Sequence, residues 1–132
     1  MGDGYMGKIL RVDLTRGAIE QEPLNDGWAE KYIGGTGLAT RYLYEEIGPS
    51  TKPADEENPV IFMTGPLCGT RSITSGRHQI VSLSPLTGLF GESDSGGTWG
   101  EQLKKAGFDG VIVTGKSQDP VYLWIQDGQA EI

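Results

Sequence analysis

The chain has 132 residues, of which 21 are glycine and 7 are proline, and this content, roughly twice the average usage, excludes a simple helical bundle. Lys and Arg number 11 and Asp and Glu number 18, for a net charge of −7, which argues against broad electrostatic binding to nucleic acid or to a membrane surface. The single cysteine, Cys68, cannot form an internal disulfide or assemble a metal site by itself. There is no apolar run of about 18 residues and no secretory signal pattern, so we expect a cytoplasmic protein.

The first third of the chain predicts a β-hairpin followed by two helices. Residues 8–14 alternate apolar and polar side chains, and residues 18–22 supply a second strand after a glycine-containing turn. Residues 26–33 carry a short helical pattern with Asp26 as the expected N-cap, ended by a pair of glycines. Apolar residues recur at helical spacing over residues 37–47, after which a Gly-Pro pair ends the helix.

The rest of the chain predicts short strands with one further helix. An acidic loop with prolines at residues 50–59 is expected to be solvated. The expected strands are residues 60–64, 79–83, 111–114, 121–126 and 129–132, and the expected helix is residues 98–106. About six short strands with about three helices, many joined by hairpins, indicate an α+β fold of mostly antiparallel strands, not a doubly wound parallel sheet. The length suits a single domain over residues 1–132.

Two strand ends share the pattern Pro-Leu-x-Gly, at residues 65–69 and at residues 84–88. Each follows directly after an expected strand, so the two strands enter similar turns. Two ordinary Pro/Gly turns or an architectural duplication would both give this pattern, and the sequence leaves both open.

The segment of most chemical interest is rich in glycine and precedes the third expected helix. It runs from Asp94 to Glu101, and its candidate site residues are Asp94, Ser95, Gly96 and Gly97. Paired glycines let the backbone approach a ligand closely, and N–H groups at a helix start favour a phosphate or another anion. An ordinary capped helix, with glycine serving only tight packing, is the alternative. A second glycine run at residues 34–37 lacks the spacing of a dinucleotide-binding fingerprint.

Three further kinds of side chain are candidates for a site. Arg77 lies just before an expected strand, where its guanidinium could reach a phosphate or could instead brace the loop. The only histidine, His78, has no nucleophile pattern around it, so we interpret it as an ordinary loop residue without a catalytic triad. Trp28, Trp99 and Trp124 are expected to be packing residues, although Trp99 could line a flat ligand. No catalytic residue is predicted within the chain.

Seven segments, in order over nearly the whole chain, carry a resemblance to a known family. They are residues 7–14 (GKILRVDL), 32–39 (YIGGTGLA), 64–70 (TGPLCGT), 75–77 (SGR), 84–88 (SPLTG), 95–97 (SGG) and 103–113 (LKKAGFDGVIV). Each motif alone is weak, but the ordered series resembles the N-terminal domain of the tungsten-containing aldehyde:ferredoxin oxidoreductase family.

The resemblance implies an α+β domain built from two related sheet units, on which a tungsten or molybdenum bis-pterin cofactor lies. In that family the pterin dithiolenes hold the metal, which agrees with a chain that has one cysteine and one histidine. By position, Arg77 corresponds to an arginine that contacts a pterin phosphate. Asp94 and Gly96 correspond to residues of a pterin-contacting glycine loop, which also includes Ser95 and Gly97.

The resemblance also implies a longer protein. The family's enzymes oxidise aldehydes to carboxylic acids with ferredoxin as electron acceptor, and their 4Fe–4S cluster motif lies beyond the region matched here. We therefore expect an incomplete N-terminal cofactor-binding domain that is inactive in isolation and part of a possible homo-oligomer. A short non-catalytic binding or assembly protein, or a related aromatic-ring thioester reductase subunit, are the alternatives. Asp94 departs from the family pattern, which often has Asn there, and Cys68 replaces a commoner Thr.

Overall fold

The computed structural model describes residues 4–132, and short strands alternate with three helices in this part of the chain. In chain order the elements are β1 (Lys8–Asp13), β2 (Ala18–Pro23), α1 (Asp26–Tyr32), α2 (Gly35–Glu46), β3 (Val60–Thr64), β4 (His78–Leu83), β5 (Phe90–Ser95), α3 (Trp99–Lys105), β6 (Gly110–Thr114), β7 (Trp124–Gln126) and β8 (Gln129–Glu131).

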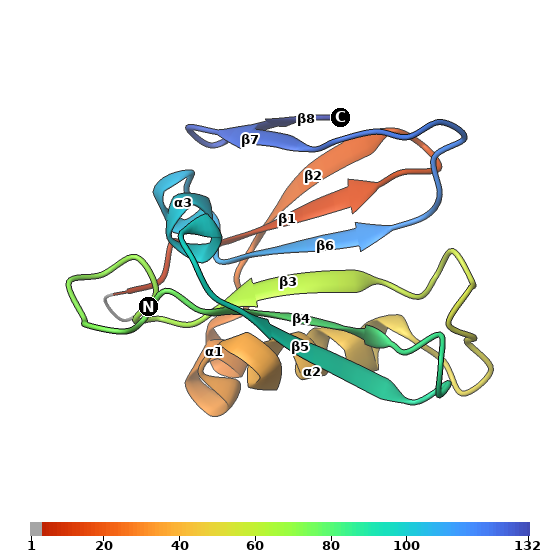
Figure 1. Ribbon diagram of the computed structural model, residues 1–132, viewed down its shortest axis with the longest axis horizontal. Helices are drawn as coiled ribbons and strands as arrows, with labels where there is room; N and C mark the ends of the chain where they lie inside the picture. The colour runs from red at the N-terminus through yellow and green to blue at the C-terminus, as the bar shows by residue number, and fades with distance from the viewer. Residues whose placement is uncertain (1–3) are drawn as a thin grey trace.

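A six-stranded sheet in the order β2-β1-β6-β3-β4-β5 forms the centre of the described residues (Figure 1). Its neighbouring strands pair antiparallel except for β1 and β6, which run parallel with Ile9 opposite Gly110. β7 and β8 form a separate hairpin. The predicted α+β class with mostly antiparallel strands is therefore confirmed.

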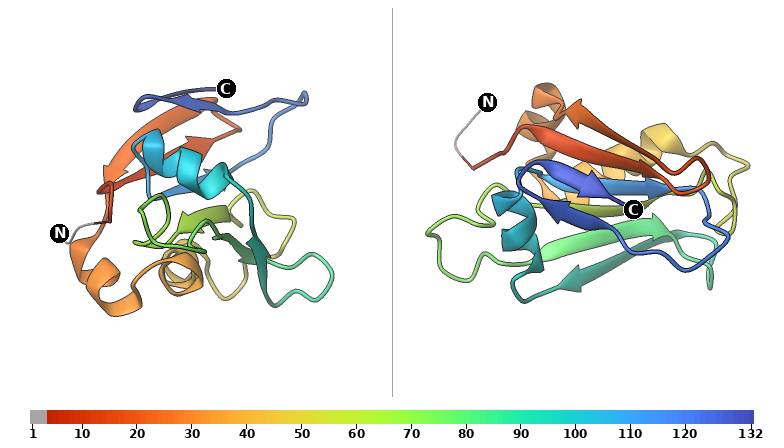
Figure 2. Two further views of the ribbon diagram at one scale, coloured as in Figure 1. Left: turned by 60° about the vertical axis from the view of Figure 1, so that its left-hand side comes forward. Right: turned by 90° about the horizontal axis from the view of Figure 1, so that it is seen from above.

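Both faces of the sheet are covered, so its central strands bury side chains on two sides. Figure 2 shows α1 and α2 on one face, and α3 with the β7–β8 hairpin on the other. Successive side chains of a strand point to opposite faces. In β1, Ile9 accordingly belongs to the core under α1 and α2, whereas Leu10 belongs to the cluster beside α3. The predicted alternation assigns only one apolar face to this strand and misses the double burial.

Several expectations about the elements are wrong. The predicted elements omit β5, because its sequence FGESDS is held by pairing with β4 and has no apolar alternation of its own. The N-cap of α1 is Asn25, not Asp26, since the Asn25 side chain accepts a hydrogen bond from the N–H of Trp28. α2 begins at Gly35, earlier than predicted. Residues 121–123 are not part of β7.

The two Pro-Leu-x-Gly turns follow β3 and β4, as predicted, but they lie at opposite ends of the sheet. These neighbouring strands are antiparallel, so their C-terminal ends point in opposite directions. The turn at residues 84–88 leads from β4 to β5 and is closed by the N–H of Gly88, which donates to the carbonyl of Ser84 at 2.8 Å. The turn at residues 65–69 lies at the other end, where β4 begins and β5 ends.

A buried ion pair holds the beginning of the described chain against the sheet. Nζ of Lys104 in α3 lies 2.5 Å from Oδ1 of Asp109, and both side chains are almost inaccessible to solvent. Asp109 also accepts hydrogen bonds from the N–H groups of Met6 and Gly7, at 3.0 and 2.7 Å. Lys104 donates to the carbonyl of Gly4 at 2.6 Å. The buried charges of Lys104 and Asp109 are thus compensated by each other and by hydrogen bonds to the backbone of residues 4–7.

Candidate functional site

The predicted site residues meet at one end of the six-stranded sheet. β3 ends there, β4 begins there and β5 ends there. α2 begins at the same end, since a Cβ on Gly34 would lie 2.8 Å from the Cα of Gly65. The loop between β3 and β4 projects beyond the sheet here (Figure 1). We call this region the glycine end and define it as residues 33–37, 65–79 and 94–97.

A hollow of about 380 Å³ opens at the glycine end, beside the loop that joins β3 to β4. Arg77 lines it from the end of this loop, Gln79 lines it from β4, and Ile33 lines it from the junction of α1 and α2. Arg77 is exposed. Among the described residues it forms no ion pair with an Asp or Glu, so its charge is available to an anion.

Asp94 lies on β5, opposite Gln79 of β4. Nε2 of Gln79 donates to Oδ1 of Asp94 at 2.6 Å, so the carboxylate has a partner within the chain. A carboxylate facing a bound phosphate would repel it, and this hydrogen bond holds one oxygen of Asp94 against Gln79. Gln79 is absent from the predicted site residues. Its position two residues after Arg77, near the start of an expected strand, is the signal that could have found it.

The glycine segment differs from its prediction in one respect. Asp94 and Ser95 belong to β5, so only the two glycines after them form a loop. The following helix, α3, has 7 residues and carries Glu101 in its first turn, so its N-terminal end suits an anion less well than predicted. The loop is close to the segment before β4, because a Cβ on Gly76 would lie 3.0 Å from the carbonyl oxygen of Gly97.

At two positions of the glycine end, packing within the chain does not require glycine. A Cβ on Gly65 or Gly96 would meet no heavy atom of residues 4–132 within 4 Å, and neither residue has a positive φ. Glycine is used where a ligand must approach the backbone closely. Thr36 in the first turn of α2 donates to the carboxylate of Glu92 at 2.7 Å, so the donors for an anion here are the guanidinium of Arg77 and the polar residues of the loop that lines the hollow. This donor set fits a phosphate-bearing cofactor such as the implied bis-pterin group.

His78 is buried, so the expectation of an ordinary loop histidine is wrong. It begins β4, is 5% exposed, and its ring lies 4.5 Å from the ring of Trp99, centroid to centroid. Burial lowers the pKa of the imidazole below its usual value. Its Nδ1 has no hydrogen-bond partner in the part of the chain that the structure describes. A neutral, packed imidazole is the result.

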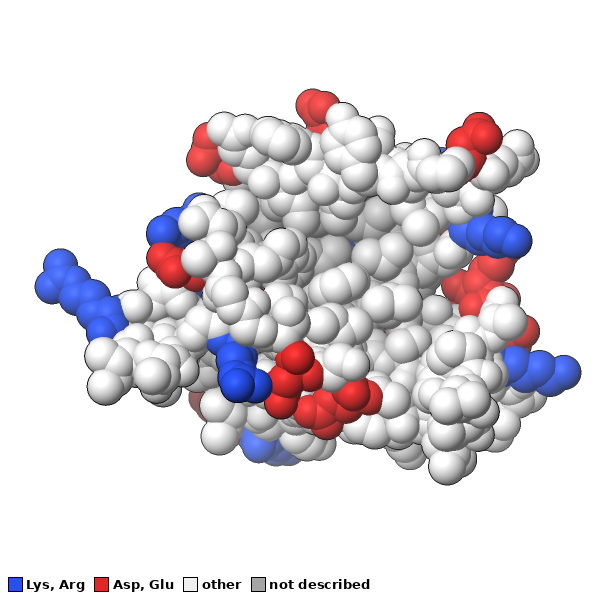
Figure 3. Space-filling view, viewed as in Figure 1, with Lys and Arg blue, Asp and Glu red and all other residues white. Residues whose placement is uncertain are grey.

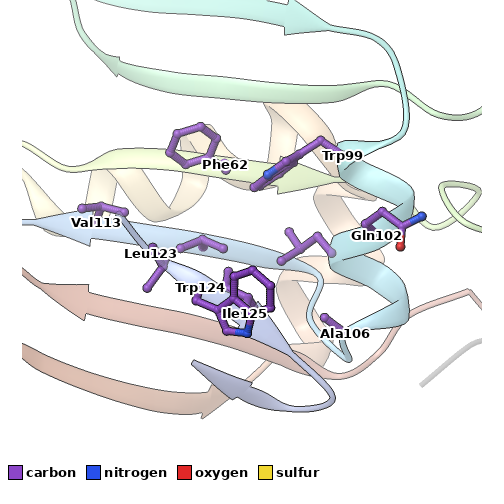
Figure 4. A pocket seen from close by; sticks show the side chains of 10 residues that line it. Phe62, Trp99, Gln102, Ala106, Val113, Leu123, Trp124 and Ile125 are labelled. Carbon is purple, nitrogen blue, oxygen red and sulfur yellow. The ribbon is translucent and has the colours of Figure 1, made fainter. Parts of the chain in front are cut away.

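A larger hollow, on the face of the sheet that α3 and β7 cover, is apolar. It has a volume of about 450 Å³ and lies between the sheet, α3 and β7, with Phe62, Trp99 and Trp124 in its wall (Figure 4). Figure 3 shows mostly uncharged atoms over the middle of this face. A phosphate needs charged or hydrogen-bonding partners, so the glycine end suits an anion better. Trp124 is exposed here, contrary to its prediction as a packing residue, whereas Trp28 packs edge-on against Tyr42.

Two further observations concern membranes and metals. None of the helices in residues 4–132 has the length and apolar character needed to cross a bilayer. The same residues contain no group of three or more His, Cys, Asp or Glu side chains arranged to hold a metal ion. Cys68 is buried, and its burial raises the pKa of the thiol.

The family model for the aldehyde ferredoxin oxidoreductase N-terminal domain matches residues 9–132. The chain belongs to this family. A tungsten-containing aldehyde ferredoxin oxidoreductase of Pyrococcus abyssi is 46% identical over 129 residues, which cover 98% of this chain and 21% of that protein. An aliphatic sulfonate oxidoreductase, WOR-like subunit, of Pyrococcus furiosus is 39% identical over 131 residues, covering 97% of this chain and 21% of that protein.

A solved structure has a similar fold and sequence. The active site complex BamBC of benzoyl coenzyme A reductase, in complex with 1,5-dienoyl-CoA, matches with a TM-score of 0.96 and 38% identity. The match covers 99% of this chain and 20% of that chain. The family resemblance is therefore confirmed, and the chain spans about a fifth of the length of the relatives that it matches. These relatives are oxidoreductases.

Proposed function

We propose that the chain is the N-terminal cofactor-binding part of a longer oxidoreductase that carries a tungsten or molybdenum bis-pterin group. The observation that carries the proposal is the glycine end, where an exposed arginine lines a hollow beside glycines that are open to ligand approach. Relatives named as tungsten-containing enzymes support the choice of cofactor. Their length, of which this chain covers 21%, supports an incomplete domain.

Arg77 binds a phosphate of the cofactor in this proposal. A guanidinium forms charge-assisted hydrogen bonds to two phosphate oxygens at once. Several convergent polar groups are needed because a phosphate loses its hydration on binding. Ser72, Thr74 and Ser75 of the loop before β4 line the same hollow and place polar groups beside the guanidinium.

Residues 94–97 place the backbone against the ring system of the cofactor. Gly96 and Gly97 present no side chain there, and a Cβ on either would enter open space. Ser95 adds a hydroxyl at the end of β5. Asp94 acts through its backbone, because its carboxylate is engaged by Gln79. These residues bind and orient the cofactor and hold no reacting proton.

The reaction that we propose for the whole enzyme is the oxidation of an aldehyde to a carboxylic acid. When bound, the cofactor supplies the two-electron chemistry, and the electrons pass to ferredoxin through an iron–sulfur cluster held elsewhere in the longer chain. A second reaction is supported by the similarity to the benzoyl coenzyme A reductase complex, at 38% identity over 99% of this chain. In that case the glycine end holds the same kind of cofactor for reduction of an aromatic thioester.

The test uses the full-length enzyme with Arg77→Ala and, as a matched control, Arg71→Ala. Both arginines are exposed in the loop before β4, but only Arg77 lines the hollow. Loss of a charge-assisted contact worth roughly 1.5–3 kcal/mol weakens cofactor binding by about 10-fold to 100-fold. We expect metal and pterin per chain to fall for Arg77→Ala and to stay at the wild-type level for Arg71→Ala.

The outcomes distinguish failure of the role assigned to Arg77 from failure of the proposed function. Equal metal and pterin content in both variants would remove Arg77 from the site. A wild-type enzyme that carries neither metal nor pterin would contradict the proposed function itself.

A further inference from the structure

The junction of α1 and α2 contains a strained turn at the edge of the glycine end. Ile33 has φ 66° and ψ −67°, and the N–H of Gly34 donates to the carbonyl of Tyr32 at 2.8 Å. A hydrogen bond across three residues with a positive φ at the centre defines the rarer, strained form of γ-turn. Ile33 is β-branched, and a positive φ is an outlier for such residues.

Packing within the chain does not explain isoleucine at this position. The side chain of Ile33 is 62% exposed, so it adds little to the core under α1 and α2. Glycine would adopt the same backbone without strain. The side chain instead lines the hollow that also contains Arg77 and Gln79. Strained backbone that the surrounding structure holds in place clusters at ligand sites, so the exposed side chain of Ile33 points to a contact with a ligand.

A hydrogen bond from the beginning of the chain holds this turn in place. Oη of Tyr5 donates to the carbonyl of Ile33 at 2.6 Å. Tyr5 lies in the segment fixed by the buried ion pair, since the next two residues donate their N–H groups to Asp109. Nζ of Lys104 lies 5.6 Å from the centroid of the Tyr5 ring. The buried pair of Lys104 and Asp109 therefore holds the segment that contains Tyr5, and Tyr5 in turn holds the strained turn at Ile33.

We propose that Ile33 contacts the ring system of the bound cofactor and that Tyr5 is the positioning residue that holds it there. This inference rests on the proposed function. Ligand sites combine apolar walls with a few convergent polar groups. Arg77 supplies the charge in this hollow and Ile33 supplies an aliphatic surface. The pair suits a flat heterocycle that carries a phosphate.

The experiment measures the release of metal and pterin from the full-length holoenzyme on dialysis, together with its unfolding midpoint. Ile33→Gly permits the same backbone conformation and removes the side chain. We expect an unfolding midpoint that is unchanged or raised and a release rate about fivefold higher. Asp127→Gly is the matched control, because Asp127 also has a positive φ, 48°, but lies in the β7–β8 turn. Its release rate is expected to stay at the wild-type value.

Tyr5 is tested by a double-variant cycle. Tyr5→Phe removes only the hydroxyl and is expected to raise the release rate about threefold in the wild-type background. If the tyrosine acts through Ile33, the same substitution in the Ile33→Gly background has no further effect on release. A purely structural role for Tyr5 would raise release equally in both backgrounds, and that result would overturn its positioning role.

The controls distinguish failure of this inference from failure of the proposed function. Wild-type release from Ile33→Gly, while Arg77→Ala loses its cofactor, would overturn the role of Ile33 and leave the proposed function standing. Equal acceleration in Ile33→Gly and Asp127→Gly would also overturn it. Wild-type release from both Ile33→Gly and Arg77→Ala would overturn the roles of both residues, whereas only a wild-type enzyme without metal and pterin would contradict the proposed function.

Discussion

Substitution of Lys104 by methionine tests whether the buried ion pair stabilises the fold. Lys104→Met keeps a long side chain but removes the ammonium from Asp109, which is 1% exposed. The carboxylate is then left with two backbone N–H groups as its partners. Removing one partner of a buried pair costs about 3–5 kcal/mol. At about 4 °C per kcal/mol for a domain of this size, the melting temperature should fall by roughly 10–20 °C.

The neighbouring lysine provides a matched control. Lys105 forms an exposed pair with Glu101, with a distance of 2.6 Å between Nζ and Oε1. Exposed helix pairs contribute about 0.3–0.5 kcal/mol, so Lys105→Met should lower the melting temperature by no more than about 2 °C. Thermal and urea unfolding, followed by circular dichroism at one ionic strength, compare the two variants. Similar small changes in both would refute the reasoning, because the carboxylate of Asp109 would then need no buried partner.

Two further predictions concern the glycine end and the buried histidine. Gly96→Ala should leave the free energy of unfolding unchanged or slightly raised, because its Cβ enters open space, while lowering the metal content of the full-length enzyme. Gly34→Ala should instead destabilise the chain, since its Cβ would lie 2.8 Å from the backbone of Gly65. Chemical denaturation together with metal analysis tests both variants. Burial lowers the pKa of His78, so the unfolded chain binds the proton more readily and the free energy of unfolding should fall as the pH drops below about 6.5. His78→Phe should remove that part of the decrease, and an unchanged pH slope in urea titrations would contradict the assignment.

Local patterns predict most of the elements because each of them is short and has its own periodicity. The β1–β2 hairpin, β3 and the three helices follow from alternation, helical spacing and glycine stops. β5 does not, because it is an edge strand of polar residues that is held by its pairing with β4. The order of the sheet depends on the parallel pairing of β1 with β6, which joins distant segments and has no local signal.

The candidate site is predictable only where a motif marks it. Arg77 and residues 94–97 follow from the family resemblance, and their role stays a prediction. Ile33 has no sequence signal, because nothing in the local pattern indicates a positive φ for a β-branched residue. The hydrogen bond from Tyr5 to its carbonyl spans 28 positions of the chain. His78 is predicted as a loop residue but is buried in β4, and the polar residues on either side of it give no sign of burial.

The most direct test of the central claim is the metal and pterin content, with the intact mass, of the native species that carries this sequence, purified without oxygen. We predict tungsten or molybdenum together with pterin on a chain several times longer than residues 1–132, as in the relatives of which this chain covers 21%. A native chain that ends at Ile132 and holds neither metal nor pterin would contradict the claim. That result would favour a non-catalytic binding protein that keeps the fold.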